Sequence, residues 1–279
     1  MYEALIHYSR FTANFPDLGA SAKLILSTGR MFGISDNAIR VYISRLTSKG
    51  VIDKLDRGHY RISQQAAPLN DFVEEWRLGE KRRKKWKTNN WLCLMTDNNL
   101  SVECQRGVGY IGFRKIQSGL WVRPDNLRLD STDILERLRS IGIASNVMLL
   151  AAGQFAEDNA QQWFSFFDIN HLNQQYADMN QRLHNSLDKL ANLSNVAAKK
   201  ETFLIGGAAI QMLIKDPLIP DQIQASRMRE ALWQTMLEYD KCGRAIWAVK
   251  LQNAPSIIPT SNVFAFNGDS RTPLIGLSL

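Results

Sequence analysis

Two segments of helical periodicity, separated by a glycine turn, stand out in the pattern of apolar and polar positions from Leu18 onward. The first segment ends near Gly33, a residue type that readily adopts the left-handed conformation that closes a helix. Ser35 or Asp36 can then cap a second helix by accepting hydrogen bonds from its first free N–H groups. The apolar positions of this second helix recur at spacings of four and three and form one stripe: Ile39, Ile43 and Leu46. The pattern therefore predicts two helices joined by a short turn.

A hairpin is expected directly after the second helix. Residues 51–55 and 59–62 are short β-like runs, and Asp56-Arg57-Gly58 between them is typical of a hairpin turn. A helix-turn-helix followed by a basic hairpin is the winged-helix pattern, in which the second helix enters the major groove and the wing reaches phosphate or the minor groove. The candidate DNA contacts are Ser35, Asn37, Arg40, Tyr42, Ser44, Arg45 and Lys49 on the helix, and Arg57, His59 and Arg61 on the wing.

Two alternatives remain open for this segment. Many small α+β domains contain a helix-turn-helix and hairpin that never touch DNA, so the pattern alone does not decide the function. The ring of Tyr42 has a second possible role, because an aromatic side chain at that position can pack on the first helix.

The distribution of charge favours the DNA-binding interpretation. The chain of 279 residues has a formal net charge of +7. Residues 1–90 hold 16 Lys and Arg against 9 Asp and Glu, whereas the other 189 residues hold 18 of each. The whole excess therefore lies in the first third, as expected for a polyanion-binding end attached to a neutral body.

A dense basic run lies at the end of this first third. Seven of the eleven positions from 77 to 87 are Lys or Arg, and the core of the run is Lys81, Arg82, Arg83, Lys84 and Lys85. One interpretation is a linker that contacts phosphate and adds salt-sensitive affinity. The other is a solvated helix between domains.

The rest of the chain predicts an α+β protein of several domains. Short buried-strand patterns at 91–95, 108–115, 119–124 and 147–151, with an amphipathic stretch at 132–139, favour a central ferredoxin-like domain. Two long helical patterns follow, at Trp163–Leu193 and Met228–Leu237, and their apolar stripes are typical of a core or a helix–helix interface. The expected division is a winged-helix domain at 1–66, a basic linker at 67–87, a central domain at 88–168 and a mainly helical domain at 169–279.

Three motifs in this order and spacing resemble the PaaX family of bacterial transcription regulators, named for repression of phenylacetate degradation. They are GISDNAIRVYISRLTSKGVI with RGHYRIS, GYIGFRKIQSGLWVRPDN, and DPLIPDQI from Asp216. The resemblance implies a winged helix, a central ferredoxin-like domain similar to the small CRISPR-adaptation nucleases, and a mainly helical C-terminal domain. It also implies a dimeric repressor that binds a palindromic double-stranded DNA operator and releases it when an aryl-CoA thioester binds.

By position, the resemblance assigns DNA reading to residues 36–49 and the wing to residues 51–62. It assigns no effector-binding residue. This sequence also departs from the family pattern at two places, and both bear on the identity of the effector more than on DNA binding. Residues 223–226 read Ile-Gln-Ala-Ser where the family often has a Trp-Pro-Gly-like segment, and the wing is short. Arg114, Lys115 and Arg123 could contact a CoA phosphate, but each could equally pair with an acid.

The sequence argues against an enzyme. The four histidines and three cysteines have no metal-ligand spacing, and the chain contains no GxSxG or P-loop pattern, so no catalytic residue, metal site or cofactor is expected. The alternative function is a metal-dependent nuclease that uses Asp97, which follows the first central strand, where the CRISPR-adaptation nucleases have a metal-binding aspartate. The other interpretation of Asp97 is an ordinary turn residue.

The expected compartment is the cytoplasm. Three cysteines with no CxxC are typical of a reducing environment. The first residues lack a secretory signal, and no 18-residue apolar window is present, so no membrane partner is expected. A homodimer would need a self-complementary apolar patch, and the apolar stripes of the long helical patterns favour the C-terminal half as its place.

Overall fold

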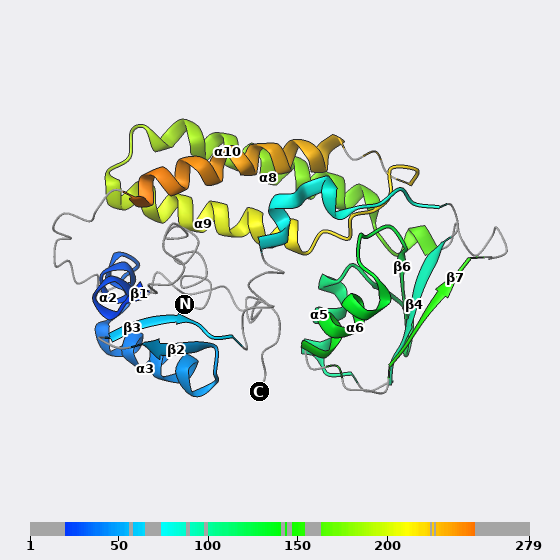
Figure 1. The fold of residues 1–279 in the computed structure, drawn as a ribbon. Coiled ribbons are helices and arrows are strands. Elements are labelled where there is room, and N and C mark those ends of the chain that lie inside the picture. Colours follow the sequence, from blue (N-terminus) through cyan, green and yellow to red (C-terminus); the bar gives the residue numbers. More distant parts are fainter. Residues whose placement is uncertain are drawn as a thin grey trace. The chain divides into compact units, whose positions relative to one another are not determined.

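The computed structural model describes residues 20–55, 58–64, 74–87, 90–97, 100–140, 143, 147–153, 163–223, 225 and 227–248. Within these ranges the fold is α+β, with long helices and two small antiparallel sheets (Figure 1). The described residues form two compact units. Unit 1 contains those up to Glu74, Arg182–Ile210 and those from Thr235, and unit 2 contains those of Glu75–Gln181 and Gln211–Gln234.

The first part of unit 1 contains the expected helix pair and hairpin. Its elements in chain order are β1 (Ala20–Ser21), α2 (Ala22–Met31), α3 (Asp36–Ser48), β2 (Ile52–Leu55) and β3 (His59–Ile62). The strands form an antiparallel sheet in the order β1-β3-β2, in which β1 is a short strand that the sequence did not reveal. The helix-closing role of Gly33, at φ 74°, and the cap by Ser35, whose hydroxyl accepts from the N–H of Ala38 at 3.3 Å, are both confirmed.

Three long helices make up most of the second half: α8 (Ile169–Leu190), α9 (Asn195–Ile214) and α10 (Arg227–Ala248). The sequence indicated α8 and the first half of α10, but α9 has apolar residues on all sides and no single stripe to detect. The boundary between the two units passes through all three helices. In unit 1, Tyr239 of α10 hydrogen-bonds Ser186 of α8 at 2.8 Å, and burial raises the pKa of Tyr239 to about 12.

Unit 2 contains a four-stranded sheet with two helices between its strands. The elements are β4 (Trp91–Met95), α5 (Val102–Tyr110), β5 (Arg114–Gln117), β6 (Leu120–Pro124), α6 (Ser131–Ser140) and β7 (Met148–Ala152). All neighbours in the order β5-β6-β4-β7 are antiparallel. In Figure 1, α5 and α6 lie together beside this sheet.

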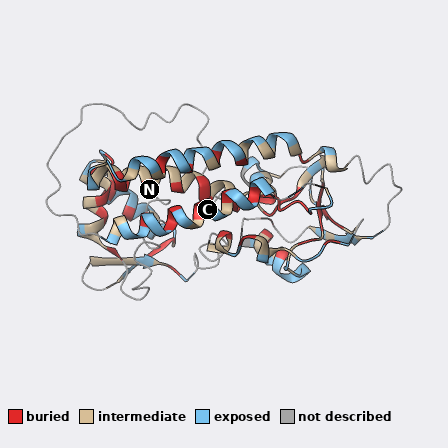
Figure 2. Cartoon of the chain, turned by 90° about the horizontal axis from the view of Figure 1, so that it is seen from above, coloured by how far each residue is buried: buried red, intermediate tan, exposed pale blue. Residues whose placement is uncertain are grey.

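The expected strand at 108–115 was wrong in its first half. Residues up to Tyr110 belong to α5, whose first turn is capped by Ser101, and the strand begins only at Arg114. The physical reason is that a short apolar run fits a buried helix end as well as a strand, and the capping serine lies outside the run. The buried stripes of the helices are visible in Figure 2 as red segments on otherwise pale ribbons.

Aromatic side chains form the core around β4 and the segment that precedes it. The ring of Trp91 lies 5.9 Å from that of Trp86, 5.3 Å from Trp163 and 5.2 Å from Phe164, measured between centroids. Trp86 and Trp91 are both buried. The basic segment before β4 is therefore held to the sheet by Trp86, which packs on Trp91. In the described part of the chain, no helix has the length and hydropathy needed to cross a membrane.

Candidate nucleic-acid interface

The outer face of α3 is mainly polar and basic, with the apolar side chain of Val41 also exposed on the helix. The residues of this helix that were proposed as DNA contacts are all exposed: Ser35, which caps the helix, and Asn37, Arg40, Tyr42, Ser44, Arg45 and Lys49. Ile39 and Ile43 on the opposite side are buried, and Leu46 is half-buried. The second helix thus presents one side to the interior and the other side to solvent.

Tyr42 is exposed by 46% and belongs to this outer face. The guanidinium of Arg45 lies 6.0 Å from the centroid of the Tyr42 ring, within the range of a cation–π contact. An arginine supported by an aromatic ring one turn away is well placed to present its planar donors outward.

The turn between α2 and α3 is fixed by an ion pair. Arg30 at the end of α2 donates from Nε and Nη2 to the two carboxylate oxygens of Asp36, at 2.7 Å and 2.6 Å. This bidentate pair joins the two helices across Gly33. The hydrogen bond from Arg30 holds the pKa of Asp36 below its usual value and raises the pKa of Arg30.

The stabilisation from this pair has a defined pH window. Because the pKa of Asp36 is lower in the folded chain than the value of about 3.9 in an unfolded one, the pair stabilises the fold above about pH 4. That contribution disappears as the pH falls through the folded-state pKa. We expect Asp36→Asn to lower the melting temperature slightly at pH 7, followed by circular dichroism, and to leave it unchanged well below pH 4. A difference that persists undiminished in acid would contradict this assignment.

The hairpin brings further basic groups to the same part of unit 1. Arg61 is exposed, with its Nε 3.8 Å from Oδ2 of Asp53, and His59 is half-buried in β3. Arg57 lies outside the described residues. A groove of about 530 Å³ lies between α2, α3 and the hairpin. It is lined by Ala22, Leu26, Arg40, Ile43, Ser44, Thr47, Ser48, Lys54 and Tyr60.

An aromatic contact joins this part of unit 1 to its long helices. Phe32, directly after α2, packs on Phe203 of α9 with ring centroids 4.8 Å apart. Phe203 in turn lies 6.4 Å from Trp247 of α10. The turn between α2 and α3 thus packs on the interior of unit 1, whereas the outer face of α3 is exposed to solvent.

The basic run at 81–85 divides into exposed lysines and inward-facing arginines. Lys81, Lys84 and Lys85 are exposed, and Lys84 pairs with Asp125 at 2.8 Å. Arg82 and Arg83 instead turn into unit 2, from the end of a 3₁₀ segment, η2 (Glu75–Arg82). The guanidinium of Arg82 donates to the carbonyl oxygen of Leu213 at 3.4 Å. Arg82 and Arg83 therefore have partners within unit 2, whereas both interpretations of the sequence had placed the basic run in solvent.

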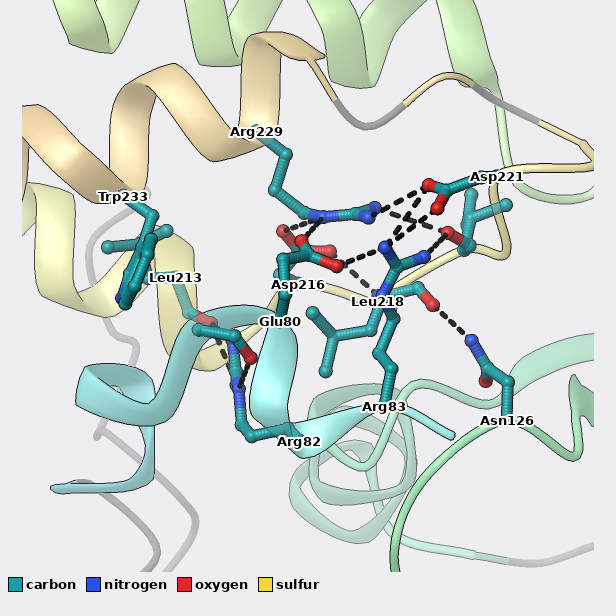
Figure 3. A network of polar contacts seen from close by, with 12 residues as sticks. Glu80, Arg82, Arg83, Asn126, Leu213, Asp216, Leu218, Asp221, Arg229 and Trp233 are labelled. Atoms are coloured by element: carbon teal, nitrogen blue, oxygen red, sulfur yellow. Dashed lines mark hydrogen bonds and ion pairs between the residues drawn. The ribbon is translucent and has the colours of Figure 1, made fainter. Parts of the chain in front are cut away.

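These arginines belong to the charged network shown in Figure 3. Arg83 donates to both carboxylate oxygens of Asp221, at 3.1 Å and 3.2 Å, and to the carbonyl oxygen of Ile219 at 3.0 Å. Arg229 of α10 donates to the same carbonyl at 3.2 Å and to Oε1 of Glu80 at 2.9 Å. Glu80 also pairs with Arg83. The segment from Asp216 to Asp221 is therefore bound both to Arg83, directly after η2, and to Arg229 of α10.

Asp216 supplies the buried negative charge near the centre of this network. Its carboxylate is fully buried, accepts from the N–H of Leu218 at 2.7 Å, and lies 4.0 Å from Nε of Arg229. Burial acts to lower the pKa of Arg229, but the carboxylates of Asp216 and Glu80 outweigh it, so the pKa is raised. Burial raises the pKa of the neighbouring Tyr176. The network thus brings guanidinium and carboxylate groups together inside unit 2.

The other proposed basic and acidic groups have separate positions. Arg123 is fully buried, where burial lowers its pKa to about 9, and it donates to Ile111, Pro124 and Asn126. Its role is to hold the loop before β5, so it is not exposed to a CoA phosphate. Lys115 is exposed beside Trp121. Asp97 is exposed after β4, and among the described residues no cluster of three His, Cys, Asp or Glu side chains could hold a metal ion.

Sequence reasoning found the exposed face of α3 but missed the charged network. Glu80, Asp221 and Arg229 were not singled out, because charge runs and periodicity give no sign of which charges face inward. The motif DPLIPDQI was the available signal, since it contains Asp216 and Asp221. Its partner Arg83, however, lies more than 130 residues earlier in the chain.

Comparison with known proteins supplies a fold likeness and no function. No family model and no curated protein matches the chain. Among solved structures, the chain is similar to the uncharacterized protein Rv0674 from Mycobacterium tuberculosis, with a TM-score of 0.51 and 20% sequence identity. The match covers 86% of this chain and 96% of that one, so the two share an overall fold.

Proposed function

We propose that this protein is a sequence-specific DNA-binding transcription regulator whose reading element is α3. The observation that carries the proposal is the division of this helix into a buried apolar side and an exposed side with Asn37, Arg40 and Arg45. Arginine and asparagine side chains are the ones that form bidentate hydrogen bonds with guanine and adenine in the major groove.

The elements around α3 support a winged-helix assignment. The order β1, helix, helix, hairpin, with β1 added beside β3, puts the hairpin next to the end of α3. A basic hairpin in that position can contact phosphates while the helix enters the groove. In unit 2, the order β5-β6-β4-β7 with a helix after β4 and after β6 agrees with a ferredoxin-like domain.

The finer part of the proposal rests on the sequence resemblance to the PaaX family. It states that the regulator is a homodimeric cytoplasmic repressor, released from its operator by a small metabolite such as an aryl-CoA thioester. The described structure contributes one constraint, since Arg123 serves the interior of unit 2. A phosphate of such an effector would need other cations.

The proposal is tested by titrating the purified chain against labelled double-stranded DNA from upstream of its own gene. The expected result is tight binding that is lost on competition with specific unlabelled DNA but not with random DNA, and that weakens steeply with salt. Adding aryl-CoA thioesters to the complex tests release. Equal affinity for all sequences would reduce the function to nonspecific binding.

Substitutions on α3 give the decisive comparison. Arg40→Ala and Arg45→Ala should each weaken operator binding by about 1–3 kcal/mol if they read bases, with a selective loss at one base position. Arg139→Ala is the matched control, because Arg139 is also an exposed helical arginine but lies on α6 in unit 2. Unchanged binding in both α3 variants would show that α3 is not the reading helix.

A cleavage assay on the same purified sample distinguishes the regulator from the alternative function, a metal-dependent nuclease. Incubation of DNA with Mg²⁺ or Mn²⁺ would produce cleavage that Asp97→Ala abolishes if Asp97 holds a catalytic metal. Binding without cleavage supports the regulator.

A further inference from the structure

One apolar side chain interrupts the polar outer face of α3. Val41 is exposed by 42%, and it lies between Arg40 and Tyr42 in the chain. The stripe of this helix that packs inward contains Ile39 and Ile43, so Val41 is not part of the buried side. The branched side chain of valine also makes it a weaker helix former than alanine, lysine or glutamate. Neither packing nor helix propensity accounts for an apolar residue at this position.

Val41 lies in the middle of the outer face. Successive residues of an α-helix are about 100° apart, so positions separated by four, three and four residues form a line along one side. The exposed residues on the line opposite the buried stripe are Asn37, Val41, Ser44 and Ser48. By the same geometry, Arg40 lies on one flank of this line and Arg45 on the other. When the outer face of α3 enters a DNA groove, this line is the part that meets the base edges.

The major groove offers one kind of apolar group to a side chain such as Val41. Thymine presents its C5-methyl group there, whereas the other bases present hydrogen-bond donors and acceptors and no methyl group. Contact between this methyl group and the valine removes apolar surface of both from water, which is favourable. At any other base, Val41 would cover polar atoms without replacing their hydrogen bonds to water. The chemistry of Val41 therefore selects thymine.

Asn37 adds a matching polar contact beside Val41. It lies four residues earlier on the same line, so the two side chains are neighbours on the helix surface. An asparagine amide matches the N6 donor and the N7 acceptor of adenine. Adenine and thymine are the two halves of one base pair, and both of their edges are exposed in the major groove. The two neighbouring side chains thus match the two features that mark A·T pairs, one through hydrogen bonds and the other through an apolar contact.

We propose that Val41 is a specificity-determining residue of α3, which recognises the C5-methyl group of a thymine next to an adenine contacted by Asn37. The assignment rests on the proposed function, because it needs α3 to lie in the major groove. It names the base that the middle of the exposed face selects, in addition to the contacts of the arginines on its flanks. Loss of one contacted methyl group should weaken binding about fourfold, as expected for one CH₂ group returned to water.

Replacing thymine by uracil in the DNA tests the contact, because uracil lacks only the methyl group and forms the same base pair with adenine. In the DNA sequence that the native chain selects, each thymine is replaced in turn by deoxyuridine. Fluorescence anisotropy then gives the dissociation constant for each DNA. The replacement should weaken binding about fourfold at the thymine that Val41 contacts.

The variant Val41→Ser shows whether Val41 is responsible, through a double-mutant cycle. Serine and valine have similar helix propensities, so the melting temperature of the chain should stay almost unchanged. Val41→Ser should bind the thymine DNA about fourfold more weakly and should no longer distinguish thymine from uracil at that position. Val102→Ser is the matched control, because Val102 is also an exposed helical valine but lies on α5 in unit 2. It should keep the full discrimination.

The possible results separate the role of Val41 from the proposed function. Selective DNA binding with no uracil effect at any thymine would overturn the role of Val41 and leave the regulator in place. The same holds if the uracil effect is equal in the native chain and in Val41→Ser. Absence of any sequence-selective binding by the native chain would instead overturn the proposed function, and the role of Val41 with it.

Discussion

Replacing Arg229 by alanine is expected to lower the free energy of unfolding by about 3–5 kcal/mol. The side chain is 3% exposed and donates to Glu80 and to the carbonyl oxygen of Ile219. Its removal leaves the buried carboxylate of Asp216 without its nearest guanidinium in α10. An uncompensated charge in the interior costs far more than a lost surface pair, so the effect should be among the largest of any single substitution.

The control for this prediction is Arg227→Ala, two residues earlier on α10, where the side chain is exposed. It should change stability by less than about 0.5 kcal/mol. Urea unfolding followed by tryptophan fluorescence measures both variants through the midpoint and its slope. Similar midpoints for Arg229→Ala and Arg227→Ala would mean that the network contributes little to stability.

Gly79→Ala should destabilise the chain by about 2–5 kcal/mol, through strain and overpacking together. Gly79 has φ 48° and ψ −126°, a conformation that an L side chain rarely adopts. A Cβ atom there would lie 2.3 Å from Cε2 of Trp233, whose indole N–H donates to the carbonyl oxygen of Trp76 at 3.0 Å. The added methyl group must therefore displace the indole or shift the η2 segment that carries Glu80 and Arg82.

Gly109→Ala separates this effect from the mere loss of a glycine. Gly109 lies in helix α5, and a Cβ atom there meets nothing within 4 Å. Alanine favours a helix over glycine by about 1 kcal/mol, so this variant should be neutral or slightly more stable. Thermal unfolding by calorimetry compares the two. A Gly79→Ala variant as stable as the native chain would show that the backbone there tolerates an ordinary side chain.

How far the sequence predicts the structure differs between the two units. In the first part of unit 1, the relevant signals are local: a closing glycine at Gly33, a capping Ser35 and an apolar stripe through Ile39 and Ile43. Each acts within one or two turns of the chain, so α3 and its exposed face could be read directly. The ion pair between Arg30 and Asp36, which joins the two helices, could not be predicted, because nothing in the pattern selects that pair among many charged residues.

In unit 2 the decisive interactions are long-range. From the sequence, Arg82 and Arg83 could be recognised only as members of a basic run, and five consecutive cations are usually expected to face solvent. The structure instead turns two of them toward Leu213, Ile219 and Asp221. Likewise α9 could not be found from periodicity, since a helix that is apolar on all sides has no stripe.

The sequence by itself determined the helix pair and its hairpin, the surplus of basic charge in the first ninety residues, and which face of α3 meets solvent, because local propensity and patterning decide these features. Only the tertiary structure decided which of those basic residues remain at the surface. Arg83 of the basic run is half-buried beside the carboxylates of Glu80 and Asp221, which the fold brings to it. Arg229 of α10 is likewise buried beside Glu80 and Asp216. A charge can leave water only where the rest of the chain supplies its partners, and that is a property of the folded whole.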